Sequence, residues 1–293
     1  HKLEPMKELA KIQHQVQLVS EMTEALSARQ VPPLAGVSDI RLLLRRAVIG
    51  STLTASELNQ VKEVLAATGA TYRYRMKLDP RWNQLINMLA RVEDNGALAR
   101  TIEGSIDSRS HVLDMASPEL SSIRHRLHEL EEQIQQELKR ILRDAVIRSA
   151  LRFPNATLSG DHYVLPVAVN HRQKVPGIVH RTSSTGDTVY VEPAALANLN
   201  AERSLIKVEE EKEIARVLRR LTAEIARVAK PLQVALEVLA QLDLIQSLAR
   251  YSLDYQMSAP RLGAEQKLWL SSARHPLLLH LFRHQAAEGD AKE

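Results

Sequence analysis

Residues 156–193 read ATLSGDHYVLPVAVNHRQKVPGIVHRTSSTGDTVYVEP, and this short stretch decides the fold. Its apolar and polar residues follow a period of two, which predicts strands at 162–169, 175–182 and 187–191, with turns at 159–161 and 183–187. Pro166 indicates an edge position, because proline lacks the N–H that a ladder needs. Strands this short bury little surface, so they need helices on which to pack.

Long helical runs flank these strands on both sides. Ser117 is a predicted N-cap, with Pro118 in the first helical position. Apolar residues then recur every three or four positions to Ala150, which predicts one helix of about 50 Å with a narrow seam of coiled-coil type. The returning run covers 194 to about 253, and Pro231 is expected to kink it. The acidic run 209–213 within it is interpreted as a solvated face.

Residues 1–116 have the pattern of a bundle of short helices, predicted at 6–26, 39–48, 54–69, 82–91 and 97–102. Thr54 and Glu57 form a capping-box pattern, and Gly69 is interpreted as the C-cap of that helix. The segment 106–115 is expected to be a polar connection, and residues 268–270 are expected to begin a strand.

The predicted fold class is therefore mainly α. It is a helical core bundle with two long antiparallel lever helices that carry a small antiparallel β clamp at their tip. The expected parts are a helical core (1–116), an outgoing lever helix (117–152), the β-rich clamp (153–193), a returning lever helix and core (194–257), and a connecting segment (258–293).

Composition sets limits on function. The 293 residues are 44% hydrophobic and 3% aromatic, which is typical of long helices, and the net charge of +4 is compatible with a nucleic-acid partner. Absence of cysteine excludes disulfides, zinc knuckles and thiol catalysis, and it fits a cytoplasmic location. No apolar run approaches the ~20 residues of a membrane span, and no signal-peptide pattern opens the chain. The chain begins at His1 without Met, and we expect it to be a fragment.

The candidate binding residues lie where the strands are richest in basic groups. No Asp or Glu occurs from 162 to 186. The loop 170–174, read as the tip between two strands, could contact phosphates, and a second polar loop follows at 181–185. An ordinary solvated hairpin tip and a simple polar turn are the alternatives for the two loops. The candidate nucleic-acid-binding residues are His171, Arg172, Lys174, His180, Arg181 and Ser183.

Patterns typical of catalysis are missing from the sequence. There is no GxxxxGK[ST] phosphate loop, no HExxH, and no arrangement that specifies a nucleophile triad. His125 with His128, and His280 with His284, are interpreted as solvated side chains rather than ligands. We therefore expect no catalytic residues, no metal site and no cofactor in this chain.

Several motifs in order resemble the second bacterial subfamily of MutS proteins (MutS-two). Within the strands these are HYVLP (162–166), KVPGIVH (174–180), the loop 183–186 and TVYVEP (188–193). Outside the strands, further segments are similar to motifs of the family. They are DMASPEL (114–120), Ile123-Arg124, Leu199-Asn200, Leu242-Asp243, ARHPLL (273–278), and residues 22–25, 36–44 and 209–213.

The resemblance implies the core, lever and clamp of such a protein, without its ATPase domain and its nuclease-type Smr module. The parent would be a dimeric ATPase, using ATP and Mg, that embraces branched or duplex DNA and suppresses recombination. Members are also linked to stalled ribosomes, which makes ribosomal RNA and ribosome rescue a second expectation. The segment 258–293 would lead toward the ATPase domain.

Two positions depart from the family pattern. His162 stands where the family has Arg, and Arg181 stands where it has Asp. The second exchange makes the loop more basic, which favours phosphate contact and puts a role for the acid in doubt. The leading hypothesis is a nucleic-acid-binding lever and clamp without catalysis. The alternative is a coiled-coil scaffold that docks a protein or the ribosome through its β knob.

Overall fold

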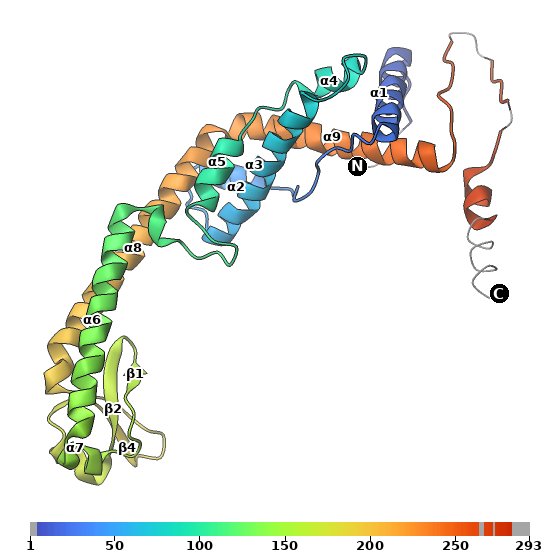
Figure 1. Cartoon of the computed structure of the whole chain (residues 1–293). Helices are drawn as coiled ribbons and strands as arrows, with labels where there is room; N and C mark the ends of the chain where they lie inside the picture. Colours follow the sequence, from blue (N-terminus) through green and yellow to red (C-terminus); the bar gives the residue numbers. More distant parts are fainter. Residues whose placement is uncertain (1–4, 264–266, 272, 283–293) are drawn as a thin grey trace. The chain divides into compact units, whose positions relative to one another are not determined.

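The computed structural model describes residues 5–263, 267–271 and 273–282 (Figure 1). The chain divides into two compact units. Unit 1 contains residues 1–50, 60–100 and 224–293, and unit 2 contains residues 51–59 and 101–223. Most described residues are helical, and one small antiparallel sheet lies in unit 2, so the predicted fold class is confirmed. The five-part division proposed above is finer than these two units and stays a prediction.

Unit 1 is a helical bundle around an aliphatic core. It holds α1 (Leu9–Ser27), α2 (Arg41–Val48), most of α3 (Ala55–Arg75), α4 (Asn83–Leu89), the start of α5 (Gly96–Glu103) and α9 (Ala229–Asp254). Helices α1 and α2 pack on α9. The most apolar window of α9 has a mean hydropathy of 1.3, and half of it is buried. Length and composition alone would let such a helix cross a membrane, but its packing here is that of a core helix.

A buried acid and a buried indole fix the ends of neighbouring helices in unit 1. Glu21 of α1 is 3% exposed, and its carboxylate accepts the backbone N–H of Leu85 at 2.8 Å. This bond satisfies a donor in the first turn of α4, which has no intrahelical partner. Trp82 just before α4 is 1% exposed, and its Nε1 donates to Glu24 Oε2 at 2.9 Å.

Helix α3 shows one correct and one wrong local prediction. The capping box is confirmed: Thr54 N donates to Glu57 Oε2 at 2.9 Å, and Glu57 N donates to Thr54 Oγ1 at 3.3 Å. Gly69 does not cap the helix, because α3 continues through it to Arg75. A Cβ at Gly69 would lie 3.2 Å from the Cα of Gly96, so glycine here permits a close backbone approach.

Unit 2 is built on two antiparallel helices, α6 (Pro118–Arg143) and α8 (Ala197–Arg227). As predicted, Ser117 caps α6, with its Oγ accepting from Leu120 N at 3.0 Å. Ser117 Oγ also donates to Glu213 Oε1 at 2.6 Å, and Glu213 is 8% exposed. The acidic run 209–213 is therefore not a fully solvated face, because Glu213 is buried against the start of α6. The short 3₁₀ helix η1 (Asp114–Ala116) lies just before α6.

The outgoing helix is shorter than predicted. It ends at Arg143, and a separate short helix, α7 (Ala145–Ala150), follows. Asp144 causes the break: its backbone is extended, and its Oδ1 accepts from Val146 N at 2.8 Å and Ile147 N at 3.2 Å. An aspartate in this conformation begins a new helix rather than continuing the old one. The apolar seam alone did not reveal this cap.

The sheet has four strands, all antiparallel. They are β1 (Thr157–Ser159), β2 (His162–Ala168), β3 (Gly177–Thr182) and β4 (Thr188–Pro193), in the order β1-β2-β4-β3. The strands β2 and β3 are therefore not neighbours, and the loop between them is not a hairpin tip. It forms the 3₁₀ helix η2 (Val169–Lys174). The turn 183–187 joins the true hairpin, β3 with β4.

One apolar cluster joins the sheet to α6 and α8. Leu165, Val167, Val189 and Val191 of β2 and β4 are buried against the same core as the C-terminal half of α6. The α6 members are Leu130, Ile134, Leu138 and Ile141, and Ile206 comes from α8. Figure 1 shows β2 and β4 beside this part of α6. The expected helical base for the strands is thus observed, since a sheet of this size cannot bury a core alone.

The edge position predicted from Pro166 is wrong, because β2 lies between β1 and β4 in the sheet. The proline is tolerated there because its carbonyl accepts from Arg152 N at 2.8 Å, on the side away from β4. Its missing N–H therefore costs no bond to β4. Pro231 divides the returning run, because α8 ends at Arg227 and α9 begins at Ala229. The predicted strand at 268–270 is wrong, because these described residues form no strand.

Candidate nucleic-acid interface

Positive charge is concentrated in the clamp and the helix end beneath it. Between residues 138 and 186 there are eight Lys or Arg and two Asp, a net +6, whereas the whole chain has +4. The rest of the chain therefore has 31 basic and 33 acidic residues, a net −2. Both aspartates are engaged in local structure: Asp144 caps α7, and Asp161 pairs with Lys207 Nζ at 2.7 Å. The site is thus more basic than the sequence-wide charge suggests.

Part of this charge comes from residues that the sequence analysis did not select. Helix α7 packs against η2, which brings Arg148 and Lys174 to the same end of the clamp. Both side chains are exposed, and the part of the chain that the structure describes offers neither an acidic partner. Further exposed basic residues at this end are Lys139, Arg143 and Arg152. The sequence feature that could have identified these residues is the excess of basic over acidic side chains at 139–152, which continues into the strands. We call Arg143, Arg148, Arg152 and Lys174 the basic end of the clamp.

Two of the predicted site residues hold the backbone together. Arg172 donates from Nη1 to Val175 O at 2.7 Å and from Nη2 to Gly177 O at 2.6 Å. Its guanidinium therefore fixes the path from η2 to β3. Ser183 Oγ accepts from Thr188 N at 3.1 Å and so closes the hairpin turn. The half-buried His171 lies on η2. A role for these three residues in binding stays a prediction.

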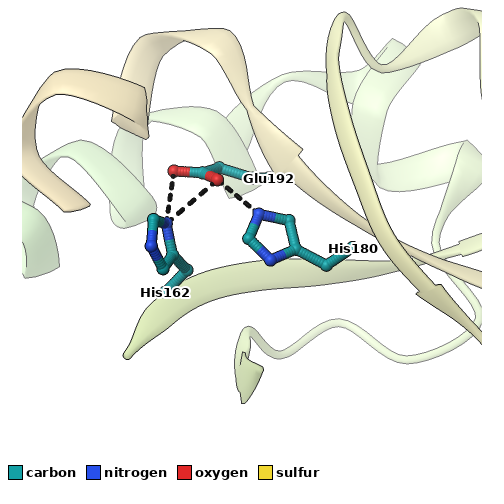
Figure 2. A group of neighbouring side chains, drawn as sticks. All are labelled: His162, His180 and Glu192. Carbon is teal, nitrogen blue, oxygen red and sulfur yellow. Dashed lines mark hydrogen bonds and ion pairs between the residues drawn. The ribbon is translucent and has the colours of Figure 1, made fainter. Parts of the chain in front are cut away.

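The predicted residues of β3 lie further along the sheet. The guanidinium of Arg181 lies 3.9 Å from the ring centroid of Tyr190, a cation–π contact that holds the exposed side chain over the sheet. His180 turns toward Glu192 on β4, and its side chain is 21% exposed (Figure 2). The six predicted residues therefore lie in one domain, but their side chains make different contacts, and some of them stabilise the backbone or the sheet.

Glu192 is the centre of a cluster that the sequence analysis missed. Its side chain is 4% exposed, and both carboxylate oxygens lie 3.1 Å from His162 Nδ1. His180 Nε2 lies 2.5 Å from Oε2, and Asn200 Nδ2 donates to Oε1 at 2.8 Å. Burial raises the pKa of Glu192, but the hydrogen bonds from Asn200, His162 and His180 outweigh burial and hold this pKa below its ordinary value. The carboxylate is therefore ionised at neutral pH.

Other histidines behave as expected for surface groups. His125 Nε2 lies 3.3 Å from Glu129, and His128 Nε2 lies 3.6 Å from Glu132, with both imidazoles more than 70% exposed. His280 Nδ1 contacts Tyr255 Oη at 2.8 Å. The second member of that pair, His284, lies outside the described residues.

Comparison with known proteins defines the family. The model of MutS domain III matches residues 3–249. The chain belongs to the MutS family, and this region is its domain III. Endonuclease MutS2 of Acetivibrio thermocellus is 34% identical over 281 residues, which is 94% of this chain and 35% of the relative. Putative endonuclease MutS2 of Bacillus subtilis is 35% identical over 282 residues, which is 94% of this chain and 36% of the relative.

These matches confirm the resemblance that the motifs indicated. The chain is a MutS domain III region homologous to MutS2 proteins, and it spans about a third of the length of these relatives. The word endonuclease describes the whole relatives. Most of their length lies outside the part to which this chain is similar, so the name alone assigns no activity to these residues.

Proposed function

We propose that this domain III region binds nucleic acid through the clamp, without catalysis of its own. The observation that supports the proposal is the concentration of charge: the clamp region has a net +6 in a chain whose remaining residues have a net −2. Charge of one sign gathered on a small domain, with its few acids engaged in capping and ion pairs, is the electrostatic pattern of phosphate contact.

The basic end supplies contacts that fit a phosphate backbone rather than base edges. Arg148 and Lys174 come from adjacent elements, α7 and η2, so two charges on different segments can meet one nucleic-acid strand. Arg181, fixed over Tyr190, adds a further cation on β3. Contacts of this kind position a protein on a duplex without reading its sequence. This suits a protein that recognises the shape of a branched nucleic acid.

The test is fluorescence anisotropy of this chain with single-stranded DNA, duplex DNA and a four-way junction, across a salt series. Arg148→Glu with Lys174→Glu removes two exposed cations and leaves the backbone bonds of Arg172 intact. Loss of two phosphate contacts lowers the slope of log K against log salt by about 1.8. Between roughly 50 and 200 mM salt, wild-type affinity should therefore fall about twelvefold more than that of the variant.

A matched variant separates the effect of the basic end on binding from the effect of the net charge of the chain. Arg73→Glu with Lys77→Glu makes the same change of charge at exposed positions on and just after α3, in unit 1. This control should bind as the wild type does. Equal affinity and equal salt slope in the wild type and the Arg148 and Lys174 double variant would refute binding through the basic end.

A second candidate function is docking of a protein or ribosome, and a specific observation favours it. Apolar side chains are exposed in the clamp region: Val146 is 58% exposed, Phe153 64%, Val169 51% and Ile178 61%. Where exposed apolar groups form one contiguous patch, they mark an interaction site. Binding to ribosomes that resists salt and is lost in Phe153→Ser, with no affinity for free DNA, would favour docking over the first proposal.

The wider protein is proposed by homology. We propose a cytoplasmic homodimer that uses ATP and Mg outside this chain and acts on branched DNA to suppress recombination, or on stalled ribosomes in ribosome rescue. The residues here do not fit an ATP site, since the sequence lacks the glycine-rich phosphate loop. We therefore place any ATPase step in other parts of such a protein.

A further inference from the structure

Three side chains from three strands converge at one point of the clamp sheet. His162 comes from β2, His180 from β3 and Glu192 from β4, and their ligand atoms all lie within 4.8 Å of one another. Figure 2 shows both imidazole rings turned toward the carboxylate. The ring centroids of the two histidines are 4.9 Å apart. The basic end and Arg181, on which the proposed nucleic-acid binding rests, share no residue with this cluster, although His180 is one of the six candidate nucleic-acid-binding residues.

A β-bulge places one of the three. The ladder between β3 and β4 pairs Val179 with Val191 and Arg181 with Tyr190, so His180 is the extra residue of a bulge. Bulges re-aim side chains, and they are found beside functional sites. Here the bulged residue faces Glu192, with a contact of 2.5 Å between Nε2 and Oε2.

A buried asparagine fixes the carboxylate of Glu192 through a hydrogen bond. Asn200 is fully buried, and its Nδ2 donates to Glu192 Oε1 at 2.8 Å. The Asn200 side chain is itself fixed, because its Oδ1 accepts from Tyr163 N at 3.1 Å. This arrangement leaves Oε2 directed at both imidazoles. Metal sites commonly have such an outer hydrogen bond, which orients a ligating carboxylate.

We infer that His162, His180 and Glu192 form a binding site for a divalent transition metal, with Zn²⁺ the best-suited ion. Imidazole nitrogen and carboxylate oxygen are the ligand types that zinc accepts, and two histidines with one glutamate form a known three-ligand set. In the bound form, each neutral imidazole ligates through the nitrogen that now faces Glu192 and keeps its proton on the other nitrogen. The fourth position, on the solvent side of the partly exposed histidines, takes water.

Metal binding requires the three ligand atoms, which lie within 4.8 Å of one another, to reach similar separations. Ligand bonds of about 2.0–2.2 Å in a tetrahedral site place ligand atoms about 3.3 Å from one another. The contacts of 3.1 Å and 2.5 Å to Glu192 would therefore open slightly. Because His162 is 32% exposed and His180 21% exposed, rotation of their rings can supply this movement while the buried carboxylate stays in place. The bound ion would link β2, β3 and β4.

The decisive experiment titrates the tag-free chain with Zn²⁺ by calorimetry and with Co²⁺ by visible absorption. The key variant is His162→Arg, because arginine cannot ligate the ion yet can still pair with Glu192. The matched control is His128→Arg, which changes an exposed histidine of α6 in the same way and leaves the cluster intact. We expect one equivalent to bind wild type and control alike, and binding to His162→Arg to weaken at least about tenfold.

Circular dichroism checks that each variant is folded, and X-ray absorption of the zinc-bound wild type counts the imidazole ligands without any variant. Two imidazoles and one carboxylate around the ion are expected. No binding by the wild type at micromolar Zn²⁺, equal affinity in wild type and His162→Arg, or a spectrum with fewer than two imidazoles would each overturn the inference. Loss of DNA binding would not bear on it, because the basic end and the cluster share no residue.

Discussion

Arg203 links α6, α8 and the sheet through its side chain. It lies on α8 and is 5% exposed. Its Nε donates to Glu131 of α6 in a short bond, and its Nη1 donates to the carbonyl of Asp161, in the β1–β2 turn, at 2.7 Å. The guanidinium also lies 5.4 Å from the ring centroid of Tyr163. Substitution Arg203→Met keeps the aliphatic stem and removes every one of these polar contacts.

The expected loss can be estimated from the partners that remain. Removing one member of a buried ion pair costs about 3–5 kcal/mol. The loss should lie at the lower end, about 3 kcal/mol, because Glu131 still accepts from Tyr163 Oη at 2.9 Å and Asp161 still pairs with Lys207. Both acids are also partly solvated, with side chains 27% and 50% exposed. Water can therefore replace part of what Arg203 supplied.

The same pair of helices provides the matched control. Arg126 of α6 pairs with Glu209 of α8 at 3.1 Å, and the two side chains are 50% and 49% exposed. Exposed pairs of this kind contribute about 0–1 kcal/mol. Arg126→Met therefore removes an Arg–Glu bridge between the same helices at little cost, which isolates the effect of burial.

Hydrogen exchange measured by mass spectrometry is the suitable assay, because its peptides distinguish the amides of unit 2 from those of unit 1. In Arg203→Met, amides of β1 and β2 should lose about 150-fold in protection, which corresponds to about 3 kcal/mol. In Arg126→Met they should change less than about fivefold. Equal effects of the two substitutions would refute the view that burial makes the Arg203 contacts important.

Three further predictions concern local geometry. Gly177→Ala should destabilise the clamp by about 2–3 kcal/mol in thermal melts, since a Cβ there would lie 1.9 Å from a carbonyl oxygen of β4; Gly186→Ala, with a φ of +77° and open space around it, should cost only about 1 kcal/mol. The hydrogen bond from Arg216 holds the pKa of Glu213 below its ordinary value, so the ionised carboxylate stabilises the fold at neutral pH. The advantage of wild type over Glu213→Gln in urea unfolding should therefore shrink as the pH falls through the acidic range, and a constant difference would contradict this. Asp144→Ala should cost about 1 kcal/mol and speed hydrogen exchange in α7, whereas unchanged exchange would show that its cap contributes nothing.

Local chemistry was readable from the sequence where a residue acts on its near neighbours. Ser117 caps α6, and Thr54 with Glu57 forms the capping box, because each bond spans only three residues. The clash of a proline ring with the preceding turn likewise predicted the break before Pro231. Asp144 was missed, since an uninterrupted apolar seam concealed a cap of the same kind.

Pairing across the sheet was not readable in this way. Strands were expected at 162–169, 175–182 and 187–191, close to the observed β2, β3 and β4, but their order was not expected, and β4 lies between β2 and β3. Period-two patterns say which face a residue occupies and nothing about which strand lies beside it. The segment 170–174 is therefore not a hairpin tip but part of a 3₁₀ helix, and Arg172 donates a hydrogen bond to the backbone carbonyl of Val175 there.

The sequence alone predicted the caps at Ser117 and Thr54, the approximate positions of three strands, the family and the sign of the charge in the clamp, because these follow from residue types at short separations. Only the tertiary structure decided that Gly69 meets Gly96 and that His162, His180 and Glu192 converge. Each of those contacts depends on strand order, a bulge or helix packing. Such features are set by the burial of apolar surface from distant segments, and no local pattern specifies them.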